Sequence, residues 1–314
     1  MQHLPVMVAE TLGWLEPRRG LFVDATLGLG GHAEALLESS PDVRLVGIDR
    51  DPEALERAGR RLERFGPRVR LVHANFHDFA TALAGLGVPD EGGIAGVLAD
   101  LGVSSLQLET AGRGFSFRLD GPLDMRMGMS DVTAADLVNE TSEGELERII
   151  REYGEEWQAR RIARAIARAR TDKPIETTGE LQRIIAQAKG PRAAREERID
   201  PATRVFQALR IEVNQELAGL ERFIQEAVDL LETGGRLVVI SYHSLEDRIV
   251  KNTLRDLARG EIDQVTGRSH AESQLIDVLT RKPQRPTEAE VEVNPRSRSA
   301  RLRAARKLPE VSRR

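Results

Sequence analysis

The chain has 314 residues, a length that suits one large domain or two, and its 40% hydrophobic residues are enough for an aliphatic core. It contains no cysteine, which excludes disulfides, thiolate metal sites and cysteine nucleophiles. A net charge of −4 disfavours a uniformly basic nucleic-acid binder, although the arginines are segregated along the chain.

The N-terminal residues lack the charged and apolar regions of a signal peptide, and no segment approaches the about 18 uncharged apolar residues of a membrane span. We therefore expect a soluble cytoplasmic protein without membrane association.

The first hundred residues alternate between short aliphatic runs and helical patterns. The runs predict buried strands at 21–25, 44–48, 69–73 and 94–99, and the apolar spacing between them predicts helices at 31–39, 52–65 and 77–86. Strands that alternate with helices favour a parallel sheet covered on both faces. We therefore predict an α/β fold of the doubly wound type.

This pattern is interrupted in the middle of the chain. Residues 102–129 have no sustained period, 133–190 have only helical patterns, and 201–232 predict one long helix or two. Strand patterns return at 234–241 and 275–280. We predict an α/β domain in two parts, 1–112 and 204–293, with a helical insertion at 113–203 and a basic C-terminal segment at 294–314.

A glycine-rich stretch follows the first predicted strand: Asp24-Ala-Thr-Leu-Gly-Leu-Gly-Gly-His32. Glycines allow close approach of a ligand to the backbone, and Asp49, at the end of the second strand, is placed where a carboxylate accepts ribose hydroxyls. A tight turn with Asp49 as a helix cap is the alternative. The spacing of Gly28, Gly30 and Ala33 also fits a dinucleotide site, but Asp24 before the glycines favours a smaller adenosyl ligand.

The fourth strand ends at Asp100, at the sheet edge where open α/β folds bind ligands. Asp100, or a hydroxyl such as that of Ser104, could accept a hydrogen bond from a reacting amine, whereas capping of a loop is the simpler role. His243, after the fifth strand, is a second candidate. His73 and His77 have the spacing of a metal pair, but no third ligand accompanies them, and we predict no metal.

Two arginine-rich segments are candidates for phosphate contact. Arg160, Arg164 and Arg168 recur every four residues on one helix face, opposite apolar residues. Residues 294–307 contain six cationic side chains and no acid, beginning with Arg296 and Arg298. Contact with nucleic-acid phosphates is one interpretation, and a solvated face paired with acids is the other.

Over nearly its whole length the chain resembles the ribosomal small-subunit RNA methyltransferase H family. The matching motifs are His3-x-Pro5-Val6-Met7, Asp24-Ala-Thr-x-Gly-x-Gly-Gly-His32, Asp49-Arg-Asp-Pro52, Asn75-Phe76, Asp100-Leu-Gly-Val-Ser-Ser105, Gln107, Arg113-Gly-Phe-Ser-Phe117, Gly121-Pro-Leu-Asp-Met-Arg-Met127, Arg204-Val-Phe-Gln-Ala-Leu-Arg210, Ser241-Tyr-His-Ser-Leu-Glu-Asp-Arg248 and Asn294-Pro-Arg-Ser-Arg-Ser299.

The resemblance implies a class I S-adenosylmethionine methyltransferase fold with an inserted helical domain that helps to hold RNA. It implies N4-methylation of a cytidine in 16S rRNA of the small ribosomal subunit. It also implies that the cofactor is contacted by Gly30, Gly31, His32, Asp49, Phe76, Asp100 and Gln107.

The resemblance leaves three points open. Residues 252–274 lack a cysteine pair that some relatives carry, so no metal is expected there. Monomer and homodimer are both compatible with the sequence. An NAD-dependent oxidoreductase and a non-catalytic ribosome assembly factor are the alternative functions.

Overall fold

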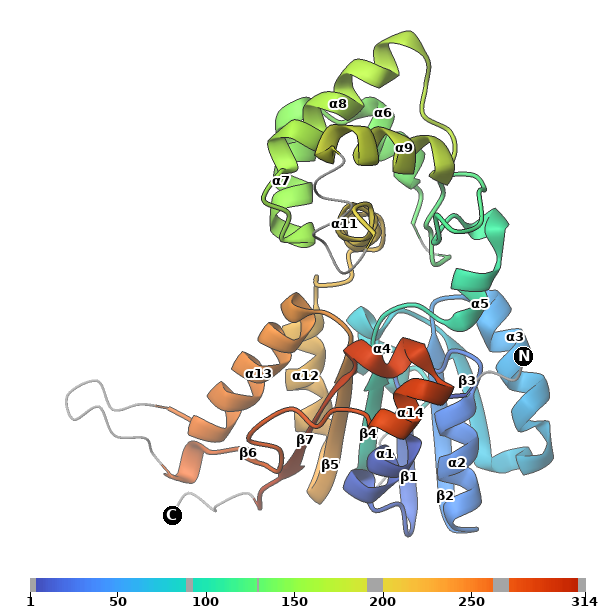
Figure 1. The fold of residues 1–314 in the computed structure, drawn as a ribbon. Helices are drawn as coiled ribbons and strands as arrows, with labels where there is room; N and C mark the ends of the chain where they lie inside the picture. The colour runs from blue at the N-terminus through green and yellow to red at the C-terminus, as the bar shows by residue number, and fades with distance from the viewer. Residues whose placement is uncertain (1–3, 89–92, 129, 191–199, 262–270, 310–314) are drawn as a thin grey trace. The chain divides into compact units, whose positions relative to one another are not determined.

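The computed structural model describes residues 4–88, 93–128, 130–190, 200–261 and 271–309 (Figure 1). His3 of the first motif, and part of the stretch 252–274, lie outside these residues. The chain divides into two compact units. The first combines Met1–Gly102 with Ala218–Arg314, and the second is Val103–Leu217.

The first unit is built on a seven-stranded sheet with the order β3-β2-β1-β4-β5-β7-β6. Strands β1 to β5 are parallel, and β7 is antiparallel to both of its neighbours, so the sheet is mixed rather than purely parallel. The strands are β1 (Gly20–Asp24), β2 (Val43–Asp49), β3 (Val69–His73), β4 (Ile94–Asp100), β5 (Leu231–Ser241), β6 (Ile276–Val278) and β7 (Arg301–Lys307).

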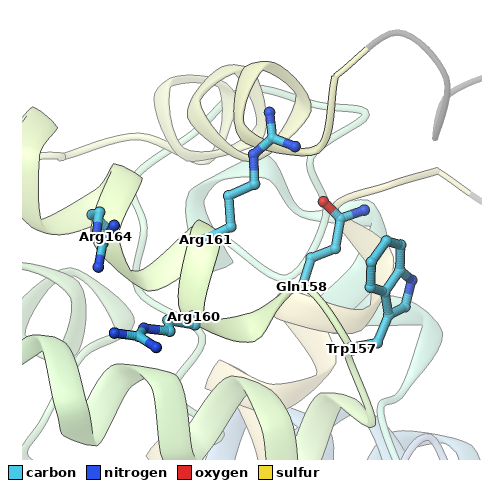
Figure 2. Close-up of a pocket in the computed structure, with 5 residues that line it drawn as sticks. All are labelled: Trp157, Gln158, Arg160, Arg161 and Arg164. Atoms are coloured by element: carbon cyan, nitrogen blue, oxygen red, sulfur yellow. The ribbon is translucent and has the colours of Figure 1, made fainter.

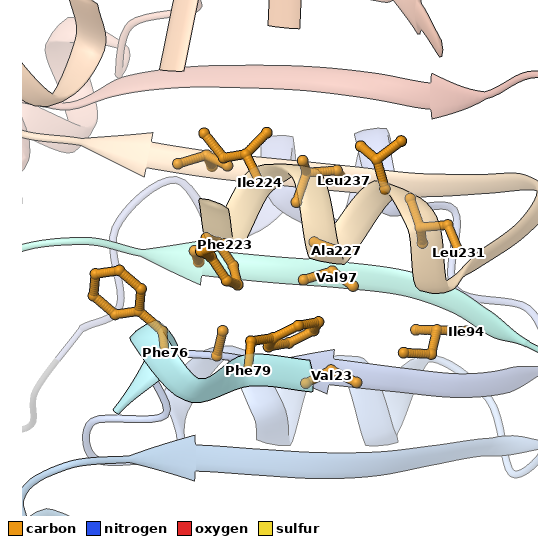
Figure 3. Close-up of a cluster of buried hydrophobic side chains, with 14 of the residues drawn as sticks. Val23, Phe76, Phe79, Ile94, Val97, Phe223, Ile224, Ala227, Leu231 and Leu237 are labelled. Atoms are coloured by element: carbon orange, nitrogen blue, oxygen red, sulfur yellow. The ribbon is translucent and has the colours of Figure 1, made fainter. Parts of the chain in front are cut away.

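Helices cover both faces of this sheet, because successive strand residues point to opposite sides. Phe22 of β1 packs with α1 (Val8–Leu15), α2 (Gly31–Ser39) and α3 (Pro52–Leu62). Val23, the next residue, packs with α4 (Phe79–Ala84), α12 (Leu220–Leu230) and α13 (Ser244–Arg259). Figure 3 shows the second core, where the ring of Phe223 lies edge-on to those of Phe76 and Phe79.

The basic C-terminal segment predicted at 294–314 does not lie outside the sheet. Residues 301–307 form β7, whose Leu302 and Ala304 are buried between sheet and helices. Two of its cations are also buried and satisfied: Arg303 donates to Asp247 at 2.7 Å, and Lys307 donates to the carbonyl of Val228 at 2.9 Å. β7 is preceded by α14 (Glu288–Val293) and the short helix η5 (Pro295–Ser299).

The second unit is helical. It contains α5 (Ser105–Glu109), α6 (Ala134–Glu140), α7 (Glu143–Gly154), α8 (Ala159–Asp172), α9 (Thr178–Lys189) and α11 (Thr203–Asn214). The predicted apolar face of α8, Ile162 and Ile166, lies in its core. The unit extends beyond the predicted insertion of 113–203 because α11 packs on α7 through Val205 and Leu209, within this same core.

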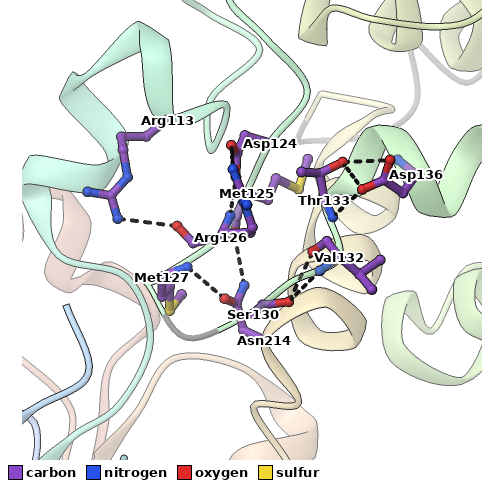
Figure 4. A network of polar contacts seen from close by, with 10 residues as sticks. All are labelled: Arg113, Asp124, Met125, Arg126, Met127, Ser130, Val132, Thr133, Asp136 and Asn214. Carbon is purple, nitrogen blue, oxygen red and sulfur yellow. Dashed lines mark hydrogen bonds and ion pairs between the residues drawn. The ribbon is translucent and has the colours of Figure 1, made fainter. Parts of the chain in front are cut away.

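The stretch without sequence periodicity is ordered by polar contacts inside the helical unit (Figure 4). Asp124 accepts three hydrogen bonds from Arg126, and Met125 has a left-handed backbone with φ of 63°. The buried amide of Asn214 accepts from the Met127 N–H and donates to the carbonyl of Met125. Side-chain contacts with distant residues therefore replace the regular backbone pairing that the sequence lacks.

Candidate functional site

Acidic side chains gather where the central parallel strands end. Asp24 ends β1, Asp49 ends β2 and Asp100 ends β4, while Tyr242 directly follows β5. Parallel pairing brings these carboxyl ends to one edge of the sheet, as the sequence predicted for the three acids.

The glycine-rich loop connects β1 to the start of α2 at this edge. Gly28 and Gly30 have positive φ angles of 53° and 75°, which favour glycine. A Cβ on Gly30 would meet Ala58 and Leu62 of α3 at 3.3 and 3.4 Å, whereas one on Gly28 would meet only the carbonyl of Thr26, at 3.9 Å. Gly30 therefore seats the loop against α3, and Gly28 leaves the loop open.

Gly31 begins α2 and lies against the N-terminal residues. A Cβ there would lie 2.9 Å from Pro5, closer than real side chains approach. The N-terminal segment is held in place at Met7, whose N–H donates to Glu290 at 2.7 Å, and at Leu4, whose carbonyl accepts from Asn294. Glu290 and Asn294 therefore bind the N-terminal segment, which packs against the start of α2.

Asp49 is bound to the backbone through both carboxylate oxygens. One oxygen accepts from the N–H of Gly28 at 2.7 Å and the other from the N–H of Asp51 at 2.8 Å. Burial raises the pKa of Asp49, although these two hydrogen bonds oppose the rise. The carboxylate thus connects the end of β2 to the glycine-rich loop, and each oxygen keeps further acceptor capacity.

A buried group of two acids and an imidazole lies behind the loop. Burial raises the pKa of Asp24 to about 7, against the opposing effects of His32 and of the Thr26 N–H. Burial lowers the pKa of His32, but its interaction with the Asp100 carboxylate, with a further contribution from Asp24, raises it overall. The His32 Nε2 is 3.4 Å from Asp100 Oδ2, and neither ring nitrogen has a hydrogen bond of good geometry among the described residues.

Asp100 is oriented from three directions. Its Oδ1 accepts from the hydroxyl of Tyr242 at 2.7 Å, its Oδ2 faces His32, and its backbone N–H donates to Thr26 Oγ1 at 2.6 Å. Burial and the Asp100 carboxylate raise the pKa of Tyr242 well above its usual value, so the phenol stays protonated as a donor. The tyrosine ring also packs near Gly102, where a Cβ would lie 3.2 Å from it.

Tyr242 is the site residue that sequence reasoning missed. It stands beside the predicted candidate His243, in a motif that follows the fifth strand, and its position at a strand end was the available signal.

His243 has a structural partner of its own. It is the N-cap of α13, its Nδ1 accepts from the Glu246 N–H at 3.4 Å, and its Nε2 is 3.2 Å from Glu246 Oε1. Glu246 completes this capping box by accepting from the N–H of His243 at 3.3 Å, and it also accepts from the N–H of Tyr242 at 2.9 Å. Among the described residues, no hydrogen bond or ion pair joins His243 to Asp100.

Two other predicted cofactor contacts, Phe76 and Gln107, belong to different units, and the histidine pair His73 and His77 has separate contacts. Phe76 begins the short helix η2 (Phe76–Asp78) and is largely buried in the core of Figure 3. Gln107 belongs to the helical unit, where its side chain accepts from the Ser104 N–H at 3.0 Å. His73 contacts the carbonyl of Arg50 at 3.0 Å, and burial lowers the pKa of His77 to about 4.

The arginine stripe of α8 is exposed, as predicted. Arg160, Arg164 and Arg168 are on the surface of the helical unit, and the buried Ile162 and Ile166 form the opposite face. Arg164 Nε lies 3.6 Å from a carboxylate oxygen of Glu143, a long contact between two half-exposed groups.

The C-terminal cations divide between two environments. Arg296 and Arg298 are exposed on η5. The four that follow lie in β7, where Arg303 and Lys307 are buried, and where the partly buried Arg301 and the exposed Arg306 form ion pairs with Asp247 and Asp277.

Among the described residues, no helix is both long and apolar enough to span a membrane.

Comparison with known proteins gives matches over almost the whole chain. The sequence profile of the MraW methylase family matches residues 1–308. Ribosomal RNA small subunit methyltransferase H of Pelobacter propionicus is 55% identical over 98% of this chain and 99% of its own. The protein of the same name from Geobacter sulfurreducens is 54% identical, with the same coverage.

A solved rRNA methylase from Streptococcus thermophilus aligns with 98% of this chain and all of its own, at 13% identity and a TM-score of 0.41, a likeness too weak to add to the assignment. The sequence matches decide it. The chain belongs to the MraW methylase family of S-adenosylmethionine-dependent methyltransferases.

Proposed function

We propose that this protein methylates the N4 amine of a cytidine in 16S rRNA of the small ribosomal subunit, in the cytoplasm. The observation that carries the proposal is Asp100, a carboxylate at the sheet edge held by Tyr242 at 2.7 Å and by Thr26 through its backbone. The names of the relatives, which specify small-subunit ribosomal RNA, support the class of substrate.

S-adenosylmethionine supplies, when bound, an adenosine and a methyl group on a positively charged sulfur. The open backbone at Gly28, and the two buried ring nitrogens of His32 that lack a good hydrogen bond, fit a polar ligand beside the loop. The spare acceptor capacity of Asp49 fits ribose hydroxyls. We assign the cofactor contacts to Gly30 and Gly31 through their backbone, and to His32, Asp49, Phe76, Asp100 and Gln107.

The exocyclic amine of cytosine is a weak nucleophile because its lone pair is delocalised into the ring. A carboxylate that accepts one N–H of the amine localises the lone pair on nitrogen and aligns it. When the N–C bond forms, the C–S bond breaks, its electron pair stays on sulfur, and the amine gives up one proton. Asp100 is the group we assign to hold this N–H and receive the proton.

We prefer Asp100 over His243 for this role. The imidazole of His243 already accepts a backbone hydrogen bond as the cap of α13 and faces the buried carboxylate of Glu246. Asp100, in contrast, is oriented by donors on other elements and lies among the proposed cofactor contacts.

We assign RNA binding to the exposed arginines. Arg160, Arg164 and Arg168 on α8 and the pair Arg296 and Arg298 on η5 would contact phosphates, the groups that dominate affinity for nucleic acid. No membrane partner is proposed.

Mass spectrometry of 16S rRNA tests the substrate. Cells that lack the protein should lose one N4-methylcytidine, the wild type should restore it, and Asp100→Asn should not. An unchanged methylation pattern in the deletion strain contradicts the proposal. Normal methylation by Asp100→Asn contradicts the role of the carboxylate.

Two further measurements separate the alternatives. Calorimetry should detect binding of S-adenosylmethionine but not of NAD, and Asp49→Ala should weaken it. Binding of Asp100→Asn to small subunits at wild-type affinity, with methylation lost, would exclude a purely non-catalytic assembly role.

A further inference from the structure

Trp157 is a large aromatic side chain that the fold holds in solvent. Its exposed fraction is 77%, whereas the neighbours Glu156 and Gln158 are 1% and 8% exposed. Isolated exposed apolar residues are common on proteins, but an indole exposed between two buried polar neighbours calls for an account.

The backbone around Trp157 is fixed by a buried ion pair. Lys189 Nζ lies 2.8 Å from Glu156 Oε2, and both side chains are fully buried. The other oxygen of Glu156 accepts from the Gln158 N–H at 2.9 Å. One turn earlier, a Cβ on Gly154 would lie 2.8 Å from the carbonyl of Arg204, so the end of α7 packs tightly against α11. The tightly packed connection between α7 and α8 therefore fixes Trp157 in its exposed position.

The indole shares a surface hollow with three arginines (Figure 2). Trp157 and Gln158, with Arg160, Arg161 and Arg164, line a hollow of about 630 Å³ at the start of α8. This volume lies within the roughly 300–1,000 Å³ of small-ligand sites. Arg160 and Arg161 make no ion pair within the part of the chain that the structure describes, and Arg164 makes only the 3.6 Å contact with Glu143.

Neighbouring arginines of the same unit are used differently. Arg148 and Arg151 of α7 form ion pairs with glutamates of their own helix. Arg170, at the end of α8, donates to the carbonyls of Val138 and Thr141. Among the described residues, Arg160 and Arg161 thus lack the ion pairs and carbonyl contacts of these neighbours, and Arg164 has only its long contact with Glu143, so an external anion would complement their charge.

We propose that Trp157, Arg160, Arg161 and Arg164 bind one unpaired nucleotide of the RNA substrate, with the base stacked on the indole and the adjacent phosphates on the guanidinium groups. Aromatic side chains recognise bases only where the bases are unstacked from a helix, and arginines take phosphates of any sequence. The inference rests on the proposed function, because it specifies how the proposed RNA substrate is held.

Fluorescence tests the stacking directly, since the chain has two tryptophans and Trp14→Phe leaves Trp157 as the sole reporter. A short unstructured oligouridine should quench this fluorescence, and a blunt RNA duplex should quench it far less. Quenching that is equal with both RNAs, or binding of the oligouridine without any quenching, would overturn the proposal. Polyglutamate that competes as well as oligouridine would assign the surface to an acidic protein instead.

Substitution of Trp157 measures how much the indole contributes to the affinity for RNA. Base stacking on an aromatic side chain is worth roughly 1–3 kcal/mol, so Trp157→Ala should weaken oligouridine binding about 5- to 150-fold. Trp157→Phe should retain most of the affinity. Leu119→Ala, which truncates an exposed apolar residue of the same unit, is the matched control and should bind normally.

Enzyme kinetics distinguish a failure of this inference from a failure of the proposed function. With small subunits as substrate, Trp157→Ala should raise KM and leave both kcat and S-adenosylmethionine affinity unchanged. If wild type methylates 16S rRNA while the KM of Trp157→Ala is unchanged, the stacking proposal alone fails. If wild type does not methylate 16S rRNA, the proposed function fails, and the quenching result still decides whether the site binds an unpaired base.

Discussion

Asp24 is a carboxylic acid in a place that disfavours its ionised form. It is 1% exposed, and burial raises its pKa from 3.8 to about 7. Between about pH 4 and pH 7 the folded protein therefore holds a proton that the unfolded chain has lost. The free energy of unfolding falls as pH rises through this window, by about 4 kcal/mol, because roughly three pKa units at about 1.4 kcal/mol each separate the two states.

Asp24→Asn removes this titration while keeping an oxygen for the Thr26 N–H, which Asp24 accepts at 3.2 Å. We expect the variant to match the wild type near pH 4 and to exceed its free energy of unfolding by up to about 4 kcal/mol at pH 8. The raised pKa of His32 gives the wild type a further loss of stability in the same direction, and without Asp24 part of that rise also disappears.

Urea unfolding between about pH 4 and pH 8, without cofactor, measures this difference. Trp14 reports on the sheet unit in a Trp157→Phe background, because its indole donates to Gln284 at 2.6 Å and so ties α1 to the C-terminal part of the unit. The exposed Asp42→Asn is the control and should follow the wild type. Parallel pH profiles for Asp24→Asn and wild type would refute the reasoning.

Three further predictions concern single contacts. Glu156→Gln removes the carboxylate that lies 2.8 Å from the buried Lys189 Nζ and should cost about 3–5 kcal/mol of unfolding free energy by urea titration. Adding Lys189→Met should recover much of the loss, and failure of the double variant to recover would contradict the ion-pair account. Gly114→Ala would place a Cβ 2.2 Å from a backbone oxygen at φ 69°, so it should lower the melting temperature by several degrees, whereas Gly112→Ala, in open space, should not. Tyr242→Phe removes a hydrogen bond to a carboxylate and should slow methyl transfer about 10- to 100-fold at unchanged S-adenosylmethionine affinity; a normal kcat would remove Tyr242 from the site.

The strands that the sequence predicted are those whose own residues carry the signal of a strand. The first four predicted strands, 21–25, 44–48, 69–73 and 94–99, correspond to β1 to β4 within about one residue. β1, β2 and β4 are largely buried on both faces and are therefore nearly continuous aliphatic runs, whereas β3, at the edge of the sheet, is only partly buried. β7 was missed because its alternation of Leu302 and Ala304 with cations resembles a solvated basic segment. Only the partners of Arg303 and Lys307, on α13 and α12, reveal why those charges are tolerated inside.

The candidate site also contains residues that the sequence could predict and contacts that it could not. Asp24, Asp49 and Asp100 could be predicted because each ends a predicted strand. The hydrogen bond from Tyr242 to Asp100 could not, since it joins residues 142 positions apart and depends on the pairing of β4 with β5. His243 was correctly placed at the end of the fifth strand, but its capping of α13 required the backbone geometry of that helix.

Because β7 lies between β5 and β6, the sheet cannot be completed until residues 301–307 have been synthesised. The helical unit is a continuous stretch of chain, so all of it has been made before translation reaches β5. Within the described part of the chain β6 pairs with β7 alone, and the edge of β5 stays unpaired until residues 301–307 emerge. A ribosome that stalls before this point would therefore display a finished helical unit and a sheet whose β5 edge is still unpaired, and chaperones or aggregation would act on that edge.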